Sequence, residues 1–369
     1  MECQNNSINV LLKNAHVQQV PSDTEWTISS FTIWHRCTLA YPEMTRKHYF
    51  PCLFYGLLLF TLGIFLYLFG VMLGIPRYLF GMQWLLVVQE VMVWYSGIPI
   101  ILSFALALID FFIFFNIKRS GKPVNMTPLH NRAVTVALTA YNDEASIGRA
   151  VMDFSQHPDV RRVIVVSNNS IDKTLEHAKN AGAITINELM PGYGRCVYRS
   201  LLEASQYDDT DLIVLSEGDC TFRALDIDKL LAYAPHADIV NGTRTNEPLR
   251  EHSTQLSTFM FYGNIFVAKL LEAKHFGRCT MSDVGTTYKL CHRSALKRLL
   301  PLVNPDINLE FNAHLLDVAL EHGITLVECP ITFHPRVGKS KGGNMSNWRS
   351  IQVGSAMIRG ITFGWKRAI

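Results

Sequence analysis

The sequence has little net charge and no dense run of basic residues. Its formal net charge is +3 over 369 residues, with 34 lysines and arginines against 31 acidic residues. Proteins that bind nucleic acid usually concentrate positive charge on one face or in one run. The composition therefore argues against nucleic acid as a partner.

Paired cysteines are also missing. The eight cysteines are scattered along the chain, and no two of them form a C-x-x-C pair. This spacing argues against a zinc module and against a disulfide framework, and it favours a reducing compartment. The dinucleotide-binding pattern G-x-G-x-x-G is incomplete too, because Gly192 and Gly194 are not followed by the third glycine.

Apolar residues are concentrated near the N-terminal third of the chain. Tyr49 to Ile75 contains no charged side chain, and Trp94 to Ile117 contains only Asp110. About 20 apolar residues in a helix cross a bilayer core. We therefore expect a transmembrane hairpin over 49–117, with spans at about 49–75 and 94–117. The apolar stretch 79–94 between them is either a separate interfacial helix or the start of a long second span.

Basic residues flank this hairpin on its outer sides. Arg46 and Lys47 precede the first span, Lys118 and Lys122 follow the second, and the connection holds only Arg77. The positive-inside rule then places both ends in the cytosol. We expect a multi-pass membrane protein whose remaining domain lies in the cytosol, preceded by a polar tail at 1–48. A buried helical hairpin of a soluble protein is the alternative.

The remainder of the chain alternates apolar strand-like runs with amphipathic helices. Strands are expected at 134–140, 162–167, 183–187 and 211–216, with helices at 144–157, 173–181 and 194–205. Strands that are apolar throughout and separated by helices indicate a parallel sheet covered on both faces. The sequence therefore predicts an α/β domain over 130–345, with a mostly parallel sheet flanked by helices.

Polar side chains follow three of these strands. They occur at 141–144, at 167–172 and at Glu217-Gly218-Asp219. In open α/β sheets, ligands bind beyond the carboxyl ends of the strands, so these groups form the candidate site. Glu217 and Asp219 offer hard oxygen ligands that suit Mg²⁺ or Mn²⁺, which takes its remaining ligands from substrate phosphates. The alternative is a turn with a helix-capping aspartate.

Two further segments carry candidate chemistry. Arg336, Lys339 and Lys341 lie among glycines and serine in a segment that suits phosphate binding, although a solvated basic loop fits the same composition. Asp283 stands beside a glycine-threonine turn, where it is either the general base for an acceptor or a cap.

These motifs, in this order, resemble the family 2 glycosyltransferases, especially the branch that contains dolichol-phosphate mannosyltransferase and its bacterial polyprenyl-phosphate relatives. The resemblance covers about residues 132–343. It assigns nucleotide-sugar contacts to the following residues: Tyr141, Asn142, Glu144, Asn168, Gly192, Gly194, Arg244, Arg336, Ser340 and Lys341. It places the acidic metal motif at Glu217 and Asp219.

The resemblance implies a GT-A fold, an inverting displacement, a nucleotide-sugar donor and Mg²⁺ or Mn²⁺. Four residues depart from the family pattern. Ser167 and Asn168 stand where paired aspartates are usual, so UDP- and GDP-linked donors both stay open. Glu217 replaces an aspartate, and Thr221 replaces a glutamine.

The predicted function is transfer of a sugar from a nucleotide-sugar to a membrane-associated lipid or glycan acceptor, polyprenyl phosphate among the candidates. One alternative is a catalytically inactive scaffold of the same fold that binds lipid or a partner. A nucleotidyltransferase is disfavoured because its glycine- and arginine-rich first loop is absent. Residues 346–369 predict either an interfacial helix or a terminal helix packed on the domain.

Overall fold

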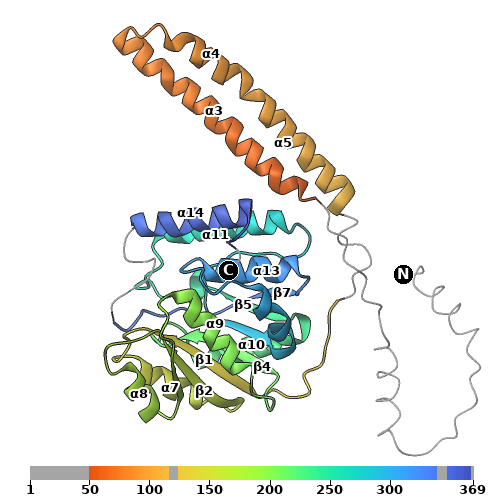
Figure 1. Cartoon of the computed structure of the whole chain (residues 1–369). Helices are drawn as coiled ribbons and strands as arrows, with labels where there is room; N and C mark the ends of the chain where they lie inside the picture. The colour runs from red at the N-terminus through yellow and green to blue at the C-terminus, as the bar shows by residue number, and fades with distance from the viewer. Residues whose placement is uncertain (1–49, 116–123, 339–346, 367–369) are drawn as a thin grey trace, which may run out of the picture. The chain divides into compact units, whose positions relative to one another are not determined.

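The computed structural model describes residues 50–115, 124–338 and 347–366, and its elements are labelled here as in Figure 1. The polar tail at 1–48 and the basic flanks of the hairpin lie outside the described residues. The N-terminal part of the description is a helical hairpin. It consists of α3 (Cys52–Phe80), α4 (Leu85–Tyr95), α5 (Gly97–Ile109) and the π-helical turn η2 (Asp110–Phe114).

Two helices of the described part are long and apolar enough to cross a membrane, Cys52–Phe80 and Leu85–Phe114. The stretch 79–94 therefore belongs mostly to a long second helix. In the most apolar part of each helix only 11% of the residues are buried, unlike the helices of a soluble core. This exposure favours membrane-spanning helices over a hairpin buried in a soluble core. Trp94 and Phe104 are among the exposed side chains of the second helix.

Glycines allow the two long helices to approach each other closely. Gly56, Gly63 and Gly70 recur every seventh residue of α3 and are buried. A Cβ atom on Gly63 would lie 2.5 Å from Ile100 and 2.9 Å from the carbonyl oxygen of Ser96. A heptad repeat keeps one seam of a helix against its partner, and small residues let membrane helices pack closely.

Asp110, the acidic residue in the second span, lies at the base of this hairpin. Its side chain is fully buried, and its Oδ2 accepts a hydrogen bond of 2.8 Å from the backbone N–H of Leu53. Because the first N–H groups of a helix have no partner within the helix, this contact satisfies one of them. Asp110 therefore caps the start of α3.

A seven-stranded sheet forms the centre of the rest of the chain. Its strands are β1 (Val134–Ala140), β2 (Val160–Ser167), β3 (Ile184–Asn187), β4 (Leu212–Glu217), β5 (Ile239–Thr243), β6 (Lys289–His292) and β7 (Leu326–Pro330). The strand order is β3-β2-β1-β4-β6-β5-β7. Only β6 runs antiparallel to its neighbours, so the predicted mostly parallel sheet is confirmed.

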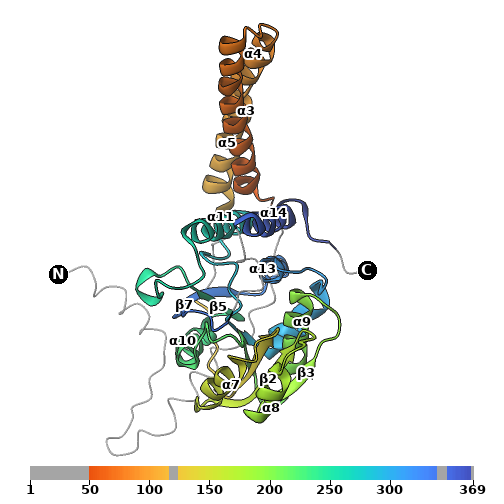
Figure 2. The ribbon, with the colours of Figure 1, turned by 90° about the vertical axis from the view of Figure 1, so that its left-hand side faces the viewer.

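Helices cover both faces of the sheet (Figures 1 and 2). They are α7 (Ile147–Ser155), α8 (Thr174–Asn180), α9 (Tyr193–Ala204), α10 (Ile227–Tyr233), α11 (Thr258–Lys274), α12 (Arg293–Leu299), α13 (Phe311–Glu321) and α14 (Asn347–Phe363). Short 3₁₀ turns η3 (Ala224–Asp226), η4 (Ala234–His236), η5 (Glu247–Leu249) and η6 (Leu300–Leu302) connect them.

The helices and the sheet enclose two hydrophobic cores. One apolar cluster joins the sheet to α7, α8 and α10, and it includes Phe154 and Leu230. The other joins the sheet to α9 and to α11 through α14, and it includes Leu271 and Met357. Phe54 of α3 belongs to the second cluster, so this apolar core continues from the α/β domain to the first turn of the hairpin.

Candidate active site

Three strand ends meet at one edge of the sheet. β1 pairs in parallel with β2 and with β4, so that Ala140 is opposite Ser167 and Thr139 is opposite Glu217. The polar segments after these strands therefore emerge side by side, as the sequence predicts.

Hydrogen bonds join the first two of these segments to each other. Asn142 has a left-handed backbone with a φ of 51°. Its N–H donates to Ser170 Oγ at 2.9 Å, and its Oδ1 accepts from the N–H of Ile171 at 2.9 Å. Glu144 accepts from the N–H of Lys173 at 3.1 Å. Tyr141, the residue directly after β1, is 47% exposed.

Asn168 connects the second segment to the glycine pair. Its Nδ2 donates to the carbonyl of Met190 at 2.9 Å, and its Oδ1 accepts from the N–H of Gly192 at 3.0 Å. Gly192 has a φ of 139°, which favours glycine. A Cβ atom on Gly194 would lie only 1.7 Å from the carbonyl oxygen of Ile307, so only glycine fits this close approach.

Glu217 and Asp219 face a single guanidinium. Nη2 of Arg336 lies 3.0 Å from Glu217 Oε2 and 2.5 Å from Asp219 Oδ2. The backbone N–H of Val337 donates to the carbonyl of Asp219 at 3.0 Å, which brings the Arg336 segment to the acidic turn. The sequence predicted both groups, and the structure brings them together. Ser340 and Lys341 lie outside the described residues.

Asp219 is almost completely buried, with 1% of its surface exposed. Thr221 donates to its Oδ1 through both its N–H, at 3.0 Å, and its hydroxyl, at 2.6 Å. Oδ2 lies close to Arg336 but receives no hydrogen bond of good geometry. Burial and the charge of Glu217 raise the pKa of Asp219 to about 7.

This donor set fits a divalent cation. Asp219 Oδ2, which is buried and makes no hydrogen bond of good geometry, and the carboxylate of Glu217 offer two hard oxygen ligands. Two such ligands suit Mg²⁺ or Mn²⁺, whose remaining ligands would come from substrate phosphate. Among the described residues, no group of three or more His, Cys, Asp or Glu side chains forms a larger cage. Glu217 and Asp219 are therefore the candidate metal ligands, and Arg336 lies beside both carboxylates.

Arg244 and Asp283 form a buried ion pair beside this centre. Arg244 Nε and Nη2 donate to the two carboxylate oxygens of Asp283 at 2.7 and 2.8 Å, a bidentate geometry. Asn264 and the N–H groups of Gly285 and Thr286 donate to the same carboxylate. Burial opposes ionisation, but Arg244 and these donors outweigh it and lower the pKa of Asp283 to about 2. A carboxylate in this setting accepts a proton poorly and fixes Arg244 well.

Three residues that the sequence did not identify complete the surroundings of Glu217. The Thr287 hydroxyl donates to Glu217 Oε1 at 2.6 Å. Thr287 in turn contacts the hydroxyl of Tyr193 at 2.5 Å, and Asn312 Nδ2 donates to that hydroxyl at 2.9 Å. Tyr193 lies between the two predicted glycines, which is the one signal in the sequence that could have found it. Thr287 belongs to the glycine-threonine turn beside Asp283, and Asn312 has no such signal.

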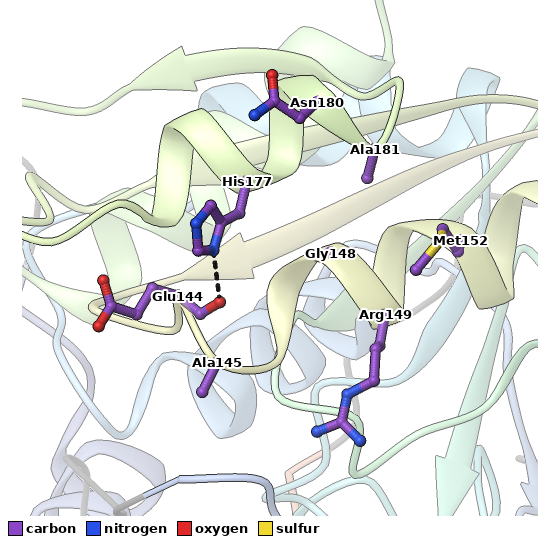
Figure 3. Close-up of a pocket in the computed structure, with 8 residues that line it drawn as sticks. All are labelled: Glu144, Ala145, Gly148, Arg149, Met152, His177, Asn180 and Ala181. Carbon is purple, nitrogen blue, oxygen red and sulfur yellow. Dashed lines mark hydrogen bonds between the residues drawn. The ribbon is translucent and has the colours of Figure 1, made fainter.

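A shallow pocket between α7 and α8 lies near Glu144 (Figure 3). His177 Nδ1 is 2.8 Å from the carbonyl oxygen of Glu144 at its rim. The remaining lining residues are mainly small or apolar, with Arg149 as the charged exception. Of the site residues described above the pocket contains only Glu144, and it includes neither the carboxylates of Glu217, Asp219 and Asp283 nor Arg244 and Arg336.

Comparison with known proteins identifies the family. A model of glycosyl transferase family 2 matches residues 135–300. An uncharacterised glycosyltransferase of Mycobacterium tuberculosis is 30% identical over 211 residues, which cover 57% of this chain and 89% of that protein. The chain belongs to glycosyl transferase family 2.

Two further likenesses were found. The dolichyl-phosphate hexose transferase of Haloferax volcanii is 27% identical to this glycosyltransferase over 209 residues, covering 56% of this chain and 86% of that protein. Glucosyl-3-phosphoglycerate synthase from Mycobacterium tuberculosis, solved with Mn²⁺ and UDP, is 19% identical, with a TM-score of 0.46 over 68% of this chain and 84% of that one.

Family membership and strand order together define the fold and the activity class. The mostly parallel sheet with helices on both faces is a GT-A fold. The protein is accordingly a glycosyltransferase that takes its sugar from a nucleotide-sugar.

Proposed function

We propose that this glycosyltransferase is anchored in a membrane and transfers a hexose to a membrane-associated acceptor, with a divalent metal bound by Glu217 and Asp219. The observation that carries the proposal is the carboxylate pair at the end of β4, with Arg336 between its oxygens. The likeness to a dolichyl-phosphate hexose transferase supports a polyprenyl phosphate as the acceptor. The donor is UDP- or GDP-linked.

The chain's own residues divide the work at the sheet edge. In this proposal Tyr141, Asn142 and Asn168 bind the nucleotide base and ribose. At the start of α9 the N–H groups of Gly192 and Tyr193 donate to the side chains of Asn168 and Asn308, which hold this turn in place. When the donor binds, the guanidinium of Arg336 leaves the two carboxylates and pairs with the diphosphate. The bound metal would neutralise the diphosphate as it leaves.

The reaction is a single displacement at the anomeric carbon. An acceptor oxygen forms the new bond to that carbon while the bond to the diphosphate oxygen breaks, and configuration inverts. If the acceptor is a phosphate, its oxygen is already ionised and no general base is needed. We therefore propose that Asp283 orients Arg244 toward the diphosphate, instead of removing a proton.

The membrane association rests on two features of the described chain. The hairpin helices are apolar and exposed. In addition, α11 and α14 lie side by side (Figures 1 and 2) and carry large exposed apolar side chains. On α11 these are Phe259, Tyr262 and Phe266, spaced three and four residues apart and therefore on one face, with exposures of 52%, 66% and 56%.

The corresponding side chains of α14 include Trp348 and Phe363, which are 67% and 85% exposed. Aromatic residues are favoured at the interface between lipid and water. Both helices belong to the apolar cluster that contains Phe54 of the hairpin. We therefore propose that α11 and α14 both lie at the lipid surface, with the catalytic domain in the cytosol. A reporter fused after Ile369 should then be cytosolic, and a signal from the opposite side would refute this orientation.

The function is tested with the purified full chain in lipid nanodiscs. The protein is incubated with Mn²⁺, polyprenyl phosphate and a panel of UDP- and GDP-linked hexoses, and the lipid fraction is analysed by mass spectrometry. We expect one donor to raise the lipid mass by one hexose, and chelation of the metal to abolish the shift. Hydrolysis of the donor to free hexose without any lipid product would refute polyprenyl phosphate as the acceptor. Absence of turnover with every donor would favour the inactive scaffold.

A further inference from the structure

A chain of buried hydrogen bonds leads from Lys289 to the carboxylate of Glu217. Lys289 on β6, Asn312 on α13 and Thr287 before β6 are 0%, 2% and 1% exposed. Tyr193, the first residue of α9, joins them through its hydroxyl. Three parts of the chain that are distant in the sequence thus contribute to one continuous polar path inside the protein.

The chemistry of the two ends fixes the direction of every hydrogen bond. Glu217 Oε1 can only accept, so the Thr287 hydroxyl donates its proton there. Thr287 Oγ1 must then accept from the Tyr193 hydroxyl.

The same logic applies to the amide in the middle of the chain. Asn312 faces the carbonyl oxygen of Gly285, which accepts only, and Lys289 Nζ, which donates only. Nδ2 of Asn312 therefore points toward Gly285 and donates to the oxygen of Tyr193 at 2.9 Å, while its Oδ1 accepts from Lys289. All donors are oriented toward Glu217, and hydrogen bonds in such a chain polarise and strengthen one another.

The side chain of Glu217 is more flexible than an aspartate, so hydrogen bonds that fix its orientation have a larger effect. It has one more rotatable bond than the aspartate usual in the family, and that extra freedom has to be lost when the carboxylate is held in one position. Thr287 fixes Oε1 at 2.6 Å, while the other oxygen, Oε2, faces Arg336 at 3.0 Å. Groups that orient a metal ligand commonly change metal affinity by 10- to 100-fold when they are removed.

From this geometry we infer that Tyr193 and Thr287 are positioning residues which hold Glu217 in the orientation that binds the divalent cation. The inference rests on the metal site of the proposed function. Because Tyr193 stands between Gly192 and Gly194, it also connects the donor-binding turn to the metal ligand. The residues act in series: Tyr193 acts on Glu217 only through Thr287.

The test measures Mn²⁺ affinity of the full chain in nanodiscs by electron paramagnetic resonance of free Mn²⁺, with saturating UDP or GDP. We expect Tyr193→Phe and Thr287→Val each to weaken Mn²⁺ binding about tenfold. Thr287→Ser, which keeps the hydroxyl, should bind as the wild type does. The double variant Tyr193→Phe/Thr287→Val should be no weaker than Thr287→Val, because serial contacts are not additive.

The matched control is Tyr198→Phe, a second tyrosine of α9 that packs partly buried against the core. It should leave Mn²⁺ affinity unchanged. Nucleotide affinity without metal and the melting temperature are measured for each variant, so that misfolding is distinguished from loss of positioning. Wild-type affinity in Tyr193→Phe, or additive effects in the double variant, would overturn the inference while the metal site stands. A wild type that binds no Mn²⁺ would overturn the metal site itself and the inference with it.

Discussion

At the scale of single residues, Asp283 has two candidate roles, general base and partner of Arg244. Loss of a general base would slow only the chemical step, whereas loss of the partner of Arg244 would also weaken donor binding. We predict that Asp283→Asn and Arg244→Ala each weaken nucleoside diphosphate affinity, and that the double variant is no worse than Arg244→Ala. Interaction energies between residues in direct contact are typically 0.5–3 kcal/mol.

Isothermal titration of the three variants with UDP and GDP provides this double-mutant cycle. Asn264→Ala serves as a milder control, because it removes one donor to Asp283 and keeps the ion pair. If Asp283→Asn binds nucleotide as the wild type does but transfers no sugar, the role of base is correct and the role of positioning group is not.

A second buried carboxylate, Asp317 on α13, connects three parts of the domain. It accepts from His275 Nε2 at 2.6 Å, from Lys274 Nζ at 2.8 Å and from Trp365 Nε1 at 2.7 Å. Burial acts to raise its pKa, but the His275 hydrogen bond and the Lys274 charge outweigh burial, and the pKa of Asp317 is lowered. The ionised network therefore stabilises the fold above the unfolded-state pKa of about 4 and loses this effect as the pH falls through the folded-state value.

Asp317→Asn should accordingly reduce the free energy of unfolding by about 3 kcal/mol at pH 7, as for other buried ion pairs that lose one partner. The difference in melting temperature between variant and wild type should narrow as the pH is lowered below 4. Thermal unfolding followed by circular dichroism over this pH range measures both. A difference that stays constant with pH would show that Asp317 does not act through its charge.

The sequence reveals some of these residues and conceals others for a physical reason. Glu217 and Asp219 directly follow a buried strand, so their place at the sheet edge follows from the pattern of the chain. Thr287 and Asn312 are ordinary polar residues whose partners lie 70 and 119 positions away in the sequence. Such contacts depend on the tertiary fold, and no local pattern encodes them.

At the scale of elements, the hairpin depends on its glycine seam. Gly63→Leu would place a large side chain where Ile100 and the carbonyl of Ser96 already lie within 3 Å. Overpacking of this kind costs about 1–3 kcal/mol. We expect the variant to separate α3 from the second span and to lower the melting temperature in detergent, whereas Gly97→Ala, which meets open space, should not. Equal melting temperatures for the two variants would contradict close packing at the seam.

The exposed aromatic residues of α11, Phe259, Tyr262 and Phe266, allow a separate test of lipid contact. In nanodiscs with brominated lipid, the extra fluorescence of Tyr262→Trp over the wild type should be quenched. Tyr233→Trp on α10, at a position that is also exposed, is the matched control and should not be quenched. Equal quenching of the two variants, or none in Tyr262→Trp, would exclude α11 from the lipid surface.

Strand prediction succeeded where the chain is continuously apolar and failed where it is not. β1 to β4 were predicted to within two residues at each end, because β-branched residues dominate them. β6 was missed, since it has only four residues and contains the buried Lys289. Burial lowers the pKa of this lysine to about 8. A charged side chain inside a short strand removes the hydrophobic signal on which such predictions depend.

At the scale of the whole molecule, one strand order explains where the chemistry lies. β1, β2 and β4 are adjacent and parallel, so the segments after them share one edge. The antiparallel β6 follows the loop that contains Asp283 and Thr287, and it brings that loop beside β4. β5 ends next to Arg244 and pairs with β7, which leads toward Arg336. The site is therefore assembled from both halves of the domain.

The central claim is that Glu217 and Asp219 bind the divalent metal on which sugar transfer depends. The most direct measurement is the rate of transfer to the lipid acceptor by Asp219→Asn, with Asp228→Asn on the exposed surface of α10 as control. We predict a loss of at least about a hundredfold for Asp219→Asn, in line with removal of a group that stabilises charge on the leaving diphosphate, and an unchanged rate for Asp228→Asn. Wild-type transfer by Asp219→Asn, or wild-type transfer that persists after chelation of all divalent metal, would contradict the account.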